Sequence, residues 1–400
     1  MAFRYLSAGE SHGPCLTVIV EGVPAGLPLD EATLAADLAR RQLRAGAGGR
    51  MDIETDRAEI LSGVMAGKTT GAPIALRIPN RDHAAWRGRA VPAYTVPRPG
   101  HADLAACAKY GFDDIRCALE RSSARETACR VAVGAIARAF LERFGIRAAS
   151  YVASLGAVPE GDTPPEAALA FAEASPSRAP DQAHEDAYTN AIHLARAQGE
   201  TLGGVIVCVV TGLPIGLGSY VTPDRRLDAR LGAALLGTNA IKGVEFADAF
   251  RGTTVPGSAL HDAIVRDAEG HIIRPTNRCG GLEAGMTTGQ PLLVRAAMKP
   301  IPTTIAPQRS IDLATGAPAE TTYERSDTCP VPRACVVLES VLLIELAAAL
   351  IEKLGGDSLG EMEARFATLP TADTLHLSPE PKVFWRDGGM EGRRDGCVEA

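Results

Sequence analysis

The sequence predicts an α+β protein built from mixed layers of helices and strands. Apolar residues make up 46% of the 400 residues, which is enough for a sizeable core. Aromatic residues make up only 4%, so Val, Ile, Leu and Ala must supply most of that core. Stretches with helical and strand-like patterning do not alternate regularly along the chain, which disfavours a doubly wound parallel sheet and favours mixed layers.

In the first 150 residues, hydrophobic spacing and turn residues define the expected elements. Strands are expected where aliphatic residues run together or alternate, at 16–21, 53–61 and 74–78. Helices are expected at 30–43, with Asp30 as N-cap, and at 126–144, with Gly145 as the glycine that ends it. Ser123-Ala-Arg-Glu126 fits a capping box before the second helix. Residues 80–101 are irregular and rich in Arg and Pro, which is typical of a loop that covers an active site.

The second half of the chain has the same mixed character. Strands are expected at 203–211 and 292–297, and helices at 186–198, 227–237 and 334–354. The stretch 334–351 is the most apolar in the chain, but Glu339 and Glu345 interrupt it, so we predict a buried helix rather than a membrane span. Residues 158–185 are rich in Pro, Ala and acidic residues, so we expect a surface segment there.

Charge and cysteine content narrow the class of protein. The net charge of −7 argues against a nucleic acid partner, which usually requires a basic face, although a local arginine cluster can still bind a small acidic ligand. The nine cysteines include no C-x-x-C pair, so neither a zinc site nor a redox pair is indicated and no metal is expected. No signal peptide pattern opens the chain. We therefore expect a cytoplasmic protein with reduced thiols.

Gly9-Glu10-Ser11-His12-Gly13 is the first segment that could carry chemistry. Its glycines allow a tight turn and the close approach of a ligand. An imidazole between them suits general acid catalysis. Taken alone, a turn with an exposed His is the more common explanation of this pattern.

Three further segments place His, Ser or Asp beside arginine, at 98–103, 121–125 and 325–327. In the first, Asp103 could orient His101, and a His that caps the following helix is the alternative. In the second, two hydroxyls and two guanidinium groups precede a helix, where free N–H groups favour anions. An ordinary capped helix is the alternative there, and a surface salt bridge is the alternative for 325–327.

Residues 63–69 look like a nucleotide-binding phosphate loop but do not fit one. Three residues separate Gly63 from Gly67, where the motif requires four, and no helix is expected after the segment. We predict a hairpin-type loop instead.

Together these segments resemble the chorismate synthase family. The matching stretches occur in the family's order and span residues 3 to about 350: 9–13 with 16–22, 98–103, 121–130, 227–245, 280–290, 299–303 and 325–327. The resemblance implies a lyase of the shikimate route to aromatic amino acids, which converts 5-enolpyruvylshikimate 3-phosphate to chorismate and phosphate by anti-1,4-elimination. It also implies a requirement for reduced FMN without net redox change, with NADPH as a candidate reductant.

The resemblance assigns roles to individual residues. His12, beside Ser11, would protonate the leaving phosphate. His101 would lie at the flavin ring and stabilise its reduced anionic form, and Asp327 would help to relay the proton from the flavin. The implied substrate-binding residues are Arg41, Arg50, Arg98 and Arg125. The implied flavin-binding residues are Arg121, Ser122, Ser123, Asn239, Ala240, Ala284, Lys299, Pro300, Ile301, Pro302, Thr303 and Arg325.

The resemblance further implies a β-α-β-α sandwich, with long central helices between antiparallel sheets, assembled as a homotetramer. We expect a single domain over residues 1–376 and a flexible tail over 377–400. No reductase domain is visible, so a separate flavin reductase is expected. Two positions depart from the family pattern: Ala47 stands where many members have Arg, and Ala284 where Gly is common. Arg44 is a candidate for the charge that Ala47 lacks.

Two other functions remain open on the sequence alone. A flavin- and NADPH-dependent oxidoreductase acting on a phosphorylated acid would use the same Arg and Ser site but would consume NADPH in proportion to product. A non-enzymatic protein that binds a phosphorylated metabolite would use the site without requiring His12 or His101 for its function.

Overall fold

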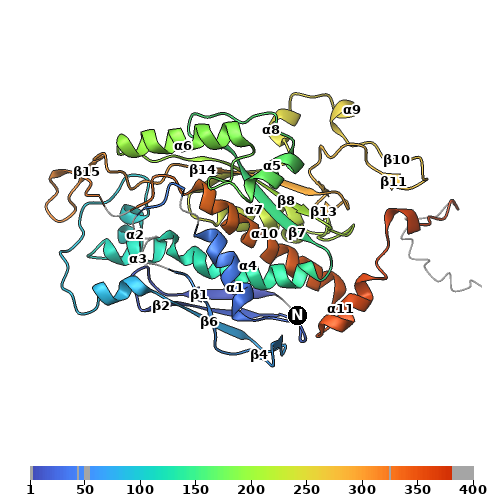
Figure 1. Ribbon diagram of the computed structural model, residues 1–400, viewed down its shortest axis with the longest axis horizontal. Coiled ribbons are helices and arrows are strands. Elements are labelled where there is room, and N and C mark those ends of the chain that lie inside the picture. The colour runs from blue at the N-terminus through green and yellow to red at the C-terminus, as the bar shows by residue number, and fades with distance from the viewer. Residues whose placement is uncertain (1–2, 43–44, 49–54, 324–325, 381–400) are drawn as a thin grey trace, which may run out of the picture.

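The computed structural model describes residues 3–42, 45–48, 55–323 and 326–380 of the chain (Figure 1). Two four-stranded antiparallel sheets enclose a layer of long helices, and a further helix packs on the outer face of the second sheet. The predicted α+β class is confirmed, as is the sandwich with central helices between antiparallel sheets.

The first sheet carries one apolar face toward the helices. Its strands follow the order β1 (Arg4–Ala8), β2 (Cys15–Glu21), β6 (Ile74–Pro79) and β3 (Glu59–Ile60). Leu16, Val18 and Val20 of β2 are buried, and the antiparallel register pairs them with buried aliphatic residues of β6. Because side chains alternate along a strand, Ile19 points to the outer face instead.

The second sheet is buried on both faces along its central strand. Its order is β7 (Arg147–Leu155), β8 (Gly204–Thr211), β14 (Leu292–Met298) and β9 (Ile241–Phe246). Ile206 and Val210 of β8 belong to the core beneath the helices, whereas Val207 and Val209 pack against α5 (Pro165–Ala172) on the opposite face. Burial on both faces explains why the sequence of β8 is almost continuously aliphatic.

Three helices form the central layer: α1 (Glu31–Arg41), α4 (Thr127–Glu142) and α10 (Val331–Leu354). In the described part of the chain, α10 is the helix long and apolar enough to cross a membrane, but 89% of its apolar window is buried within the protein. The prediction of a buried helix is therefore confirmed. Gly134 lets α4 and α10 approach closely, because a Cβ at this position would overlap Ser340.

The remaining described elements are shorter or peripheral. The helices are α2 (Asp103–Tyr110), α3 (Arg116–Ser122), α6 (Gln182–Ala197), α7 (Leu227–Leu236), α8 (Ala249–Gly252), α9 (Gly257–Leu260) and α11 (Leu359–Phe366), with single 3-10 turns η2 (Arg81–Ala85), η3 (Ala124–Glu126), η4 (Pro223–Arg225) and η5 (Ala372–Thr374). The small hairpins pair β4 (Val64–Met65) with β5 (Lys68–Thr69), β10 (Val265–Arg266) with β11 (Ile272–Ile273), β12 (Leu282–Glu283) with β13 (Met286–Thr287), and β15 (Arg309–Ile311) with β16 (Pro318–Glu320). The hairpin predicted at residues 63–69 is thus confirmed.

The predicted capping box before α4 is only half present: Ser123 is an N-cap, as predicted, but the return bond from Glu126 is not formed. The Ser123 hydroxyl accepts from the Arg125 backbone N–H at 3.3 Å and starts the 3-10 turn η3, so α4 itself begins at Thr127. The Glu126 carboxylate does not return to the cap. It accepts instead from the Ser7 hydroxyl at 3.0 Å and from Arg130 Nε at 2.9 Å, and these partners tie α4 to β1.

The predicted surface segment at 158–185 is partly wrong. It contains α5, and Ser177 and Arg178 are almost completely buried, with exposed fractions of 0% and 2%. Arg178 is buried because it pairs with the buried carboxylate of Glu339 on α10. The sequence interpretation also missed three strands of the sheets, β1, β7 and β9.

The cysteines in the described part of the chain are free thiols, as expected for a reduced protein. Burial raises the pKa of Cys129, Cys329 and Cys335 to about 12, so these thiols are chemically inert near neutral pH. Among the described residues, no cluster of His, Cys, Asp and Glu could hold a metal ion.

Candidate active site

The loop 9–13 connects β1 to β2 and packs against the end of α3. The Ser11 backbone N–H donates to the Glu120 carbonyl at 3.1 Å, and the Ser11 hydroxyl lies 3.1 Å from the Ser123 hydroxyl. Asn80 Nδ2 closes the loop by donating to two of its carbonyl oxygens, at 3.1 and 2.8 Å. Two segments that are separate in the sequence therefore form one site.

His12 is held between α3 and η2. Glu120 Oε2 accepts from the His12 backbone N–H at 2.7 Å, and Oε1 lies 2.7 Å from Nδ1 of the same residue. The other ring nitrogen, Nε2, lies 3.8 Å from a carboxylate oxygen of Asp82. The ring packs on Trp86 with centroids 4.3 Å apart, and His83 Nδ1 lies 2.9 Å from the His12 carbonyl. The imidazole is thus enclosed and fixed in orientation.

Asp56 bridges two buried arginines beside this loop. Its carboxylate accepts from Arg41 Nη1 at 3.0 Å and from Arg125 Nη1. Arg125 Nε also donates to Asn80 Oδ1 at 2.8 Å, and Arg41 donates to the Thr127 hydroxyl. Burial lowers the pKa of Arg41, Asp56 opposes this, and repulsion from Arg125 adds to it. Asp56 therefore holds two predicted substrate residues, Arg41 and Arg125, beside each other.

The second histidine belongs to a cluster centred on Asp103. This buried carboxylate accepts from Arg98 through its backbone N–H at 3.0 Å, Nε at 2.8 Å and Nη2 at 3.0 Å, and it contacts His101 Nδ1. Burial would raise the pKa of Asp103, but the hydrogen bonds from His101 and Arg98 bring it well below its usual range. The predicted Asp103–His101 contact is present. Arg98, predicted to bind substrate, donates to Asp103 and to the Thr303 hydroxyl at 3.0 Å.

The turn 299–303 joins the second histidine segment to Ala240. Lys299 Nζ donates to the Gly100 carbonyl at 2.7 Å, and the Lys299 backbone N–H donates to the Ala240 carbonyl at 3.0 Å. Ala240 has a φ of 65°, in the left-handed region that a non-glycine residue adopts only with strain. Such strain is often retained at functional sites because the surrounding structure enforces it. Pro300, Ile301 and Pro302 continue the same turn.

Arg121, Ser122 and Asn239 bring α3 and the end of α7 together. Asn239 Nδ2 donates to the Ser122 carbonyl at 3.0 Å. The Ser122 hydroxyl donates back to its own helix at 2.7 Å. Arg121 Nη2 donates to the Ser7 carbonyl at 3.0 Å and Nη1 to the Gly9 carbonyl at 3.2 Å. These predicted flavin residues therefore adjoin the loop that carries His12.

Asp327 lies against the loop that contains Ala47. Its carboxylate accepts from the Gly48 backbone N–H at 2.8 Å and pairs with Arg333. Burial and repulsion from Arg41 lower the pKa of Arg333, and the Asp56 carboxylate opposes them. Arg196 of α6 donates to the Ala47 carbonyl at 3.1 Å, so a guanidinium does reach this loop from another element.

Ala284 stands apart from the other predicted flavin residues. It lies in the turn between β12 and β13 with a φ of 50°, and the neighbouring Gly285 carbonyl accepts from the Leu227 backbone N–H at the start of α7. Asn239 follows the opposite end of this ten-residue helix, which is about 15 Å long. Within a single chain, Ala284 therefore lies apart from the other residues predicted to bind the flavin. Three predicted residues lie outside the described part of the chain: Arg44, Arg50 and Arg325.

The sequence interpretation missed four residues that shape the site: Glu120, Asp56, Trp86 and Arg333. Glu120 and His12 are 108 positions apart, and no local pattern predicts that they meet. Trp86 gave a weak signal, because an aromatic residue in an Arg- and Pro-rich loop within an aromatic-poor protein is unusual. The sequence around Asp56 carries no signal of its own, and its role follows only from its contacts with the buried Arg41 and Arg125.

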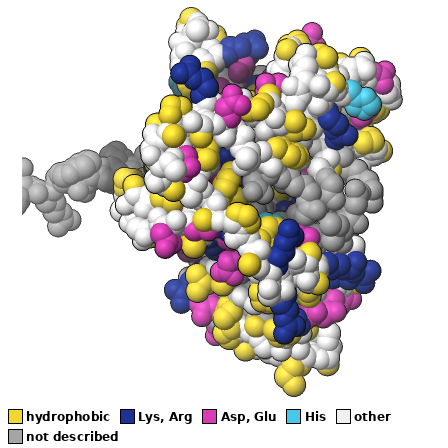
Figure 2. All heavy atoms as spheres, turned by 90° about the vertical axis from the view of Figure 1, so that its left-hand side faces the viewer, with side chains coloured by type: hydrophobic (Ala, Val, Ile, Leu, Met, Phe, Trp, Pro, Cys, Tyr) yellow, Lys and Arg dark blue, Asp and Glu magenta, His cyan; other side chains and the backbone are white. Residues whose placement is uncertain are grey.

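Figure 2 turns the left-hand end of Figure 1, where α2, α3 and β15 lie, toward the viewer. Several Lys and Arg side chains surround the middle of this face, although the protein as a whole is acidic. Asp and Glu side chains lie among them, so this face carries charges of both signs.

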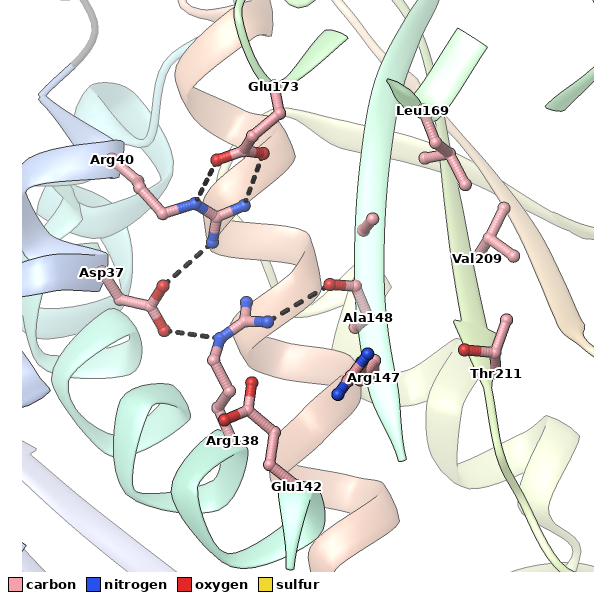
Figure 3. A pocket seen from close by; sticks show the side chains of 11 residues that line it. Asp37, Arg40, Arg138, Glu142, Arg147, Ala148, Leu169, Glu173, Val209 and Thr211 are labelled. Carbon is pink, nitrogen blue, oxygen red and sulfur yellow. Dashed lines mark hydrogen bonds and ion pairs between the residues drawn. The ribbon is translucent and has the colours of Figure 1, made fainter. Parts of the chain in front are cut away.

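A second polar region, beside Asp37 and Arg40 of α1, is structural. A cavity of about 410 Å³ opens beside Arg40 and Arg138 (Figure 3). Both guanidinium groups pair with Asp37, at 2.9 and 2.8 Å, and with the buried Glu339, at 2.9 and 2.8 Å. Because carboxylates already neutralise these cations, the network ties α1, α4 and α10 together and offers little to an anionic ligand.

The fold and the site define a class of protein before any comparison. Two imidazoles, each oriented by a carboxylate, belong to clusters that contain arginine, which suits an enzyme that moves protons on a small polyanion.

Comparison with known proteins then gives the family. The family model described as chorismate synthase matches residues 3–351. The chain is 50% identical over 381 residues to chorismate synthase of Chlorobaculum tepidum, covering 90% of this chain and 96% of that protein. It is 51% identical over 372 residues to chorismate synthase of Anaeromyxobacter dehalogenans, covering 90% and 97%. A crystal structure of chorismate synthase superposes with a TM-score of 0.75 at 40% identity, covering 92% of this chain and 97% of that one.

The chain therefore belongs to the chorismate synthase family. Its activity is that of a chorismate synthase, which is a carbon–oxygen lyase.

Proposed function

We propose that this chain eliminates phosphate from 5-enolpyruvylshikimate 3-phosphate in the anti-1,4 sense with reduced FMN bound, and that His12 protonates the leaving phosphate. In this reaction the ring C–O bond to phosphate breaks, a ring C–H bond loses its proton, and the C–H electron pair becomes part of the new diene. The observation that carries the proposal is that Glu120 holds both the backbone and the ring of His12, in the same loop as Ser11, whose hydroxyl lies 3.1 Å from that of Ser123.

His12 can act as the acid because, in the described part of the chain, Nδ1 lies within hydrogen-bond distance of a carboxylate whereas Nε2 is 3.8 Å from its carboxylate neighbour, Asp82. Nδ1 faces Glu120, and Nε2 is the nitrogen left to exchange a proton with a ligand. Transfer of that proton to the departing phosphate would reduce the negative charge that builds up on it as the C–O bond breaks, which makes it a better leaving group. The Ser11 hydroxyl would donate a hydrogen bond to the same phosphate.

The substrate carries two carboxylates and a phosphate, which require local positive charge. Arg41 and Arg125 would supply it, and the buried carboxylate of Asp56 holds both guanidinium groups in place. Arg50 and Arg98 complete the proposed substrate-binding set. A planar guanidinium can bind a carboxylate or a phosphate through two parallel hydrogen bonds, which orients the substrate as well as holding it.

Reduced FMN fits the described residues around α3. In the described part of the chain, Arg121 and Lys299 donate only to neutral oxygens, so both cations are available to a flavin phosphate. When bound, reduced FMN would lend electron density to the substrate and take up the ring proton. His101, oriented by Asp103, would stabilise the anionic form of the flavin, and Asp327 would relay the proton. The residues proposed to hold FMN are Arg121, Ser122, Ser123, Asn239, Ala240, the turn 299–303 and Arg325, with Ala284 assigned by the family pattern alone.

We further propose a cytoplasmic homotetramer whose flavin is reduced by a separate reductase, with NADPH as the electron source. The outer face of the first sheet supports self-association. Leu6 and Ile19 form a cross-strand pair there, with exposed fractions of 75% and 49%, and Leu61, which follows β3 at the opposite edge of the sheet, is 59% exposed. Light scattering of the purified protein would give the assembly state, and a monomer at micromolar concentration would contradict it.

The test of the proposed function is anaerobic phosphate release from the enolpyruvyl substrate with chemically reduced FMN present or absent. We expect one phosphate per chorismate, full dependence on reduced FMN, and no net flavin oxidation. The oxidoreductase alternative predicts instead that NADPH is consumed in proportion to product, and such stoichiometry would overturn the proposal.

A further inference from the structure

We propose that Glu120 is a positioning residue: it fixes the His12 ring in the tautomer with its proton on Nδ1 and stabilises the doubly protonated ring. This inference rests on the proposed role of His12 as the acid. Glu120 would not touch the substrate. It would act only through the imidazole.

The geometry assigns separate tasks to the two carboxylate oxygens of Glu120. Oε2 accepts from the His12 backbone N–H at 2.7 Å, and Oε1 lies 2.7 Å from His12 Nδ1. The Glu120 carbonyl accepts from the Ser11 backbone N–H at 3.1 Å. Three bonds from one residue of α3 therefore fix both the backbone and the ring of the loop, and the carboxylate cannot rotate away without losing the backbone bond.

An ionised carboxylate can only accept hydrogen bonds, so Nδ1 must be the donor. Burial raises the pKa of Glu120, but the hydrogen bonds from the His12 side chain and backbone lower it below its usual value, so the carboxylate is ionised near neutral pH. In the neutral ring the proton then lies on Nδ1. Nε2 gains and loses the second proton, the one proposed to reach the leaving phosphate.

Other charged groups also face His12. Among the described residues, Asp82 of η2 lies 3.8 Å from Nε2, and His83 of η2 contacts the His12 carbonyl. Glu10 belongs to the same loop and its side chain lies near Gly13. All of these groups remain in a variant that changes only Glu120, so a difference between that variant and the parent reports on Glu120.

Glu120→Gln makes the proposal specific, because the amide has one acceptor and one donor end. Its oxygen must face the His12 backbone N–H, since the opposite flip would place two donors against each other. The NH₂ group then faces Nδ1, which forces the ring proton onto Nε2 and opposes the doubly protonated form. Glu120→Asp keeps the charge on a shorter side chain and serves as the conservative variant.

The chain contains its own reporter for this ring. The two tryptophans are Trp86 and Trp385, and Trp86 contacts the His12 ring with centroids 4.3 Å apart. A protonated imidazole in contact with an indole quenches its fluorescence more than a neutral one does. Arg116 also lies over Trp86, at 5.6 Å, but it stays charged throughout the titration and adds only a constant.

The experiment is a fluorescence pH titration of the full chain in a Trp385→Phe background. His12→Gln identifies the step that belongs to His12, because that step should vanish. In Glu120→Gln we expect the midpoint of the step to move to lower pH by about one unit, the lower end of the usual effect of a neighbouring opposite charge. Glu120→Asp should recover at least half of the shift. Glu363→Gln, which removes an exposed carboxylate from α11, should leave the midpoint unchanged.

Turnover separates this inference from the proposed function. We expect kcat of Glu120→Gln to fall at least tenfold with KM within about threefold, and its activity to decline at lower pH than in the parent. An unmoved fluorescence midpoint in a folded Glu120→Gln protein would overturn the inference even if His12→Gln were inactive. A shifted midpoint with unchanged kcat would instead uphold the positioning and refute His12 as the acid.

Discussion

Asp56→Asn should destabilise the protein strongly, because it removes the negative charge that two buried guanidinium groups both contact. Arg41 and Arg125 side chains are 11% and 5% exposed and both contact Asp56. At an effective dielectric constant near 20, each pair at about 4 Å contributes roughly 4 kcal/mol of attraction. Removing the carboxylate recovers several kcal/mol of its own desolvation cost. The expected net loss in the free energy of unfolding is about 3 to 5 kcal/mol, the usual range for breaking a buried ion pair.

Urea unfolding followed by far-ultraviolet circular dichroism would measure this loss. Asp248→Asn provides the matched control, since Asp248 pairs with Arg251 at the surface, where both side chains are more than half exposed. The control should change stability by less than about 1 kcal/mol. Inorganic phosphate should restore part of the stability of Asp56→Asn, because an anion can replace the missing charge. If Asp56→Asn costs no more than the surface control, the arginine cluster is not held together as described.

Three further outcomes follow from the structure. Gly134→Ala should lower the free energy of unfolding in urea by about 1 to 3 kcal/mol, because its methyl group would force α4 away from α10. The control is Gly232→Ala in α7, where a Cβ meets nothing within 4 Å, and it should stabilise the protein by about 0.5 to 1 kcal/mol. Equal effects of the two substitutions would refute the close packing of α4 on α10. The pKa of Asp103 is lowered in the folded protein, so its contribution to stability is complete above about pH 4 and is lost as the pH falls further. Between pH 7 and pH 3, the free energy of unfolding should therefore fall less in Asp103→Asn than in the parent protein. Equal falls in the two proteins would contradict this. Ala47→Arg should change KM for the acidic substrate or the affinity for NADPH, and no change in either by steady-state kinetics would mean that the guanidinium already bonded to this loop fills the role.

The sequence predicted those helices and strands whose hydrophobic pattern directly reflects how they are buried in the structure. Helix α10 and strand β8 are both aliphatic segments buried on all sides. Their lengths, 24 and 8 residues, distinguish the helix from the strand. β7 was missed because Arg147-Ala-Ala-Ser150 has a weak strand signal, and pairing with β8 rather than propensity makes it a strand. The capping box at Ser123 is incomplete because Glu126 found partners on β1 and within α4, which no local rule anticipates.

The candidate site divides in the same way. His12, Ser11 and Ser123 could be proposed from sequence because each lies in a short segment with its own chemical pattern. The partners that orient them are different, because Glu120 and Asp56 reach the site only through the packing of α3 and of the chain before β3. Sequence patterns identify the reactive groups, while the groups that set their charge and orientation depend on tertiary contacts.

The measurement that tests the central claim most directly is single-turnover phosphate release by His12→Ala with reduced FMN and saturating substrate under anaerobic conditions. We expect release at least about a hundredfold slower than in the parent, with substrate affinity retained, since a general acid typically contributes two to four orders of magnitude. Parent-like release from a folded His12→Ala protein would contradict the assignment of His12 as the acid that protonates the departing phosphate.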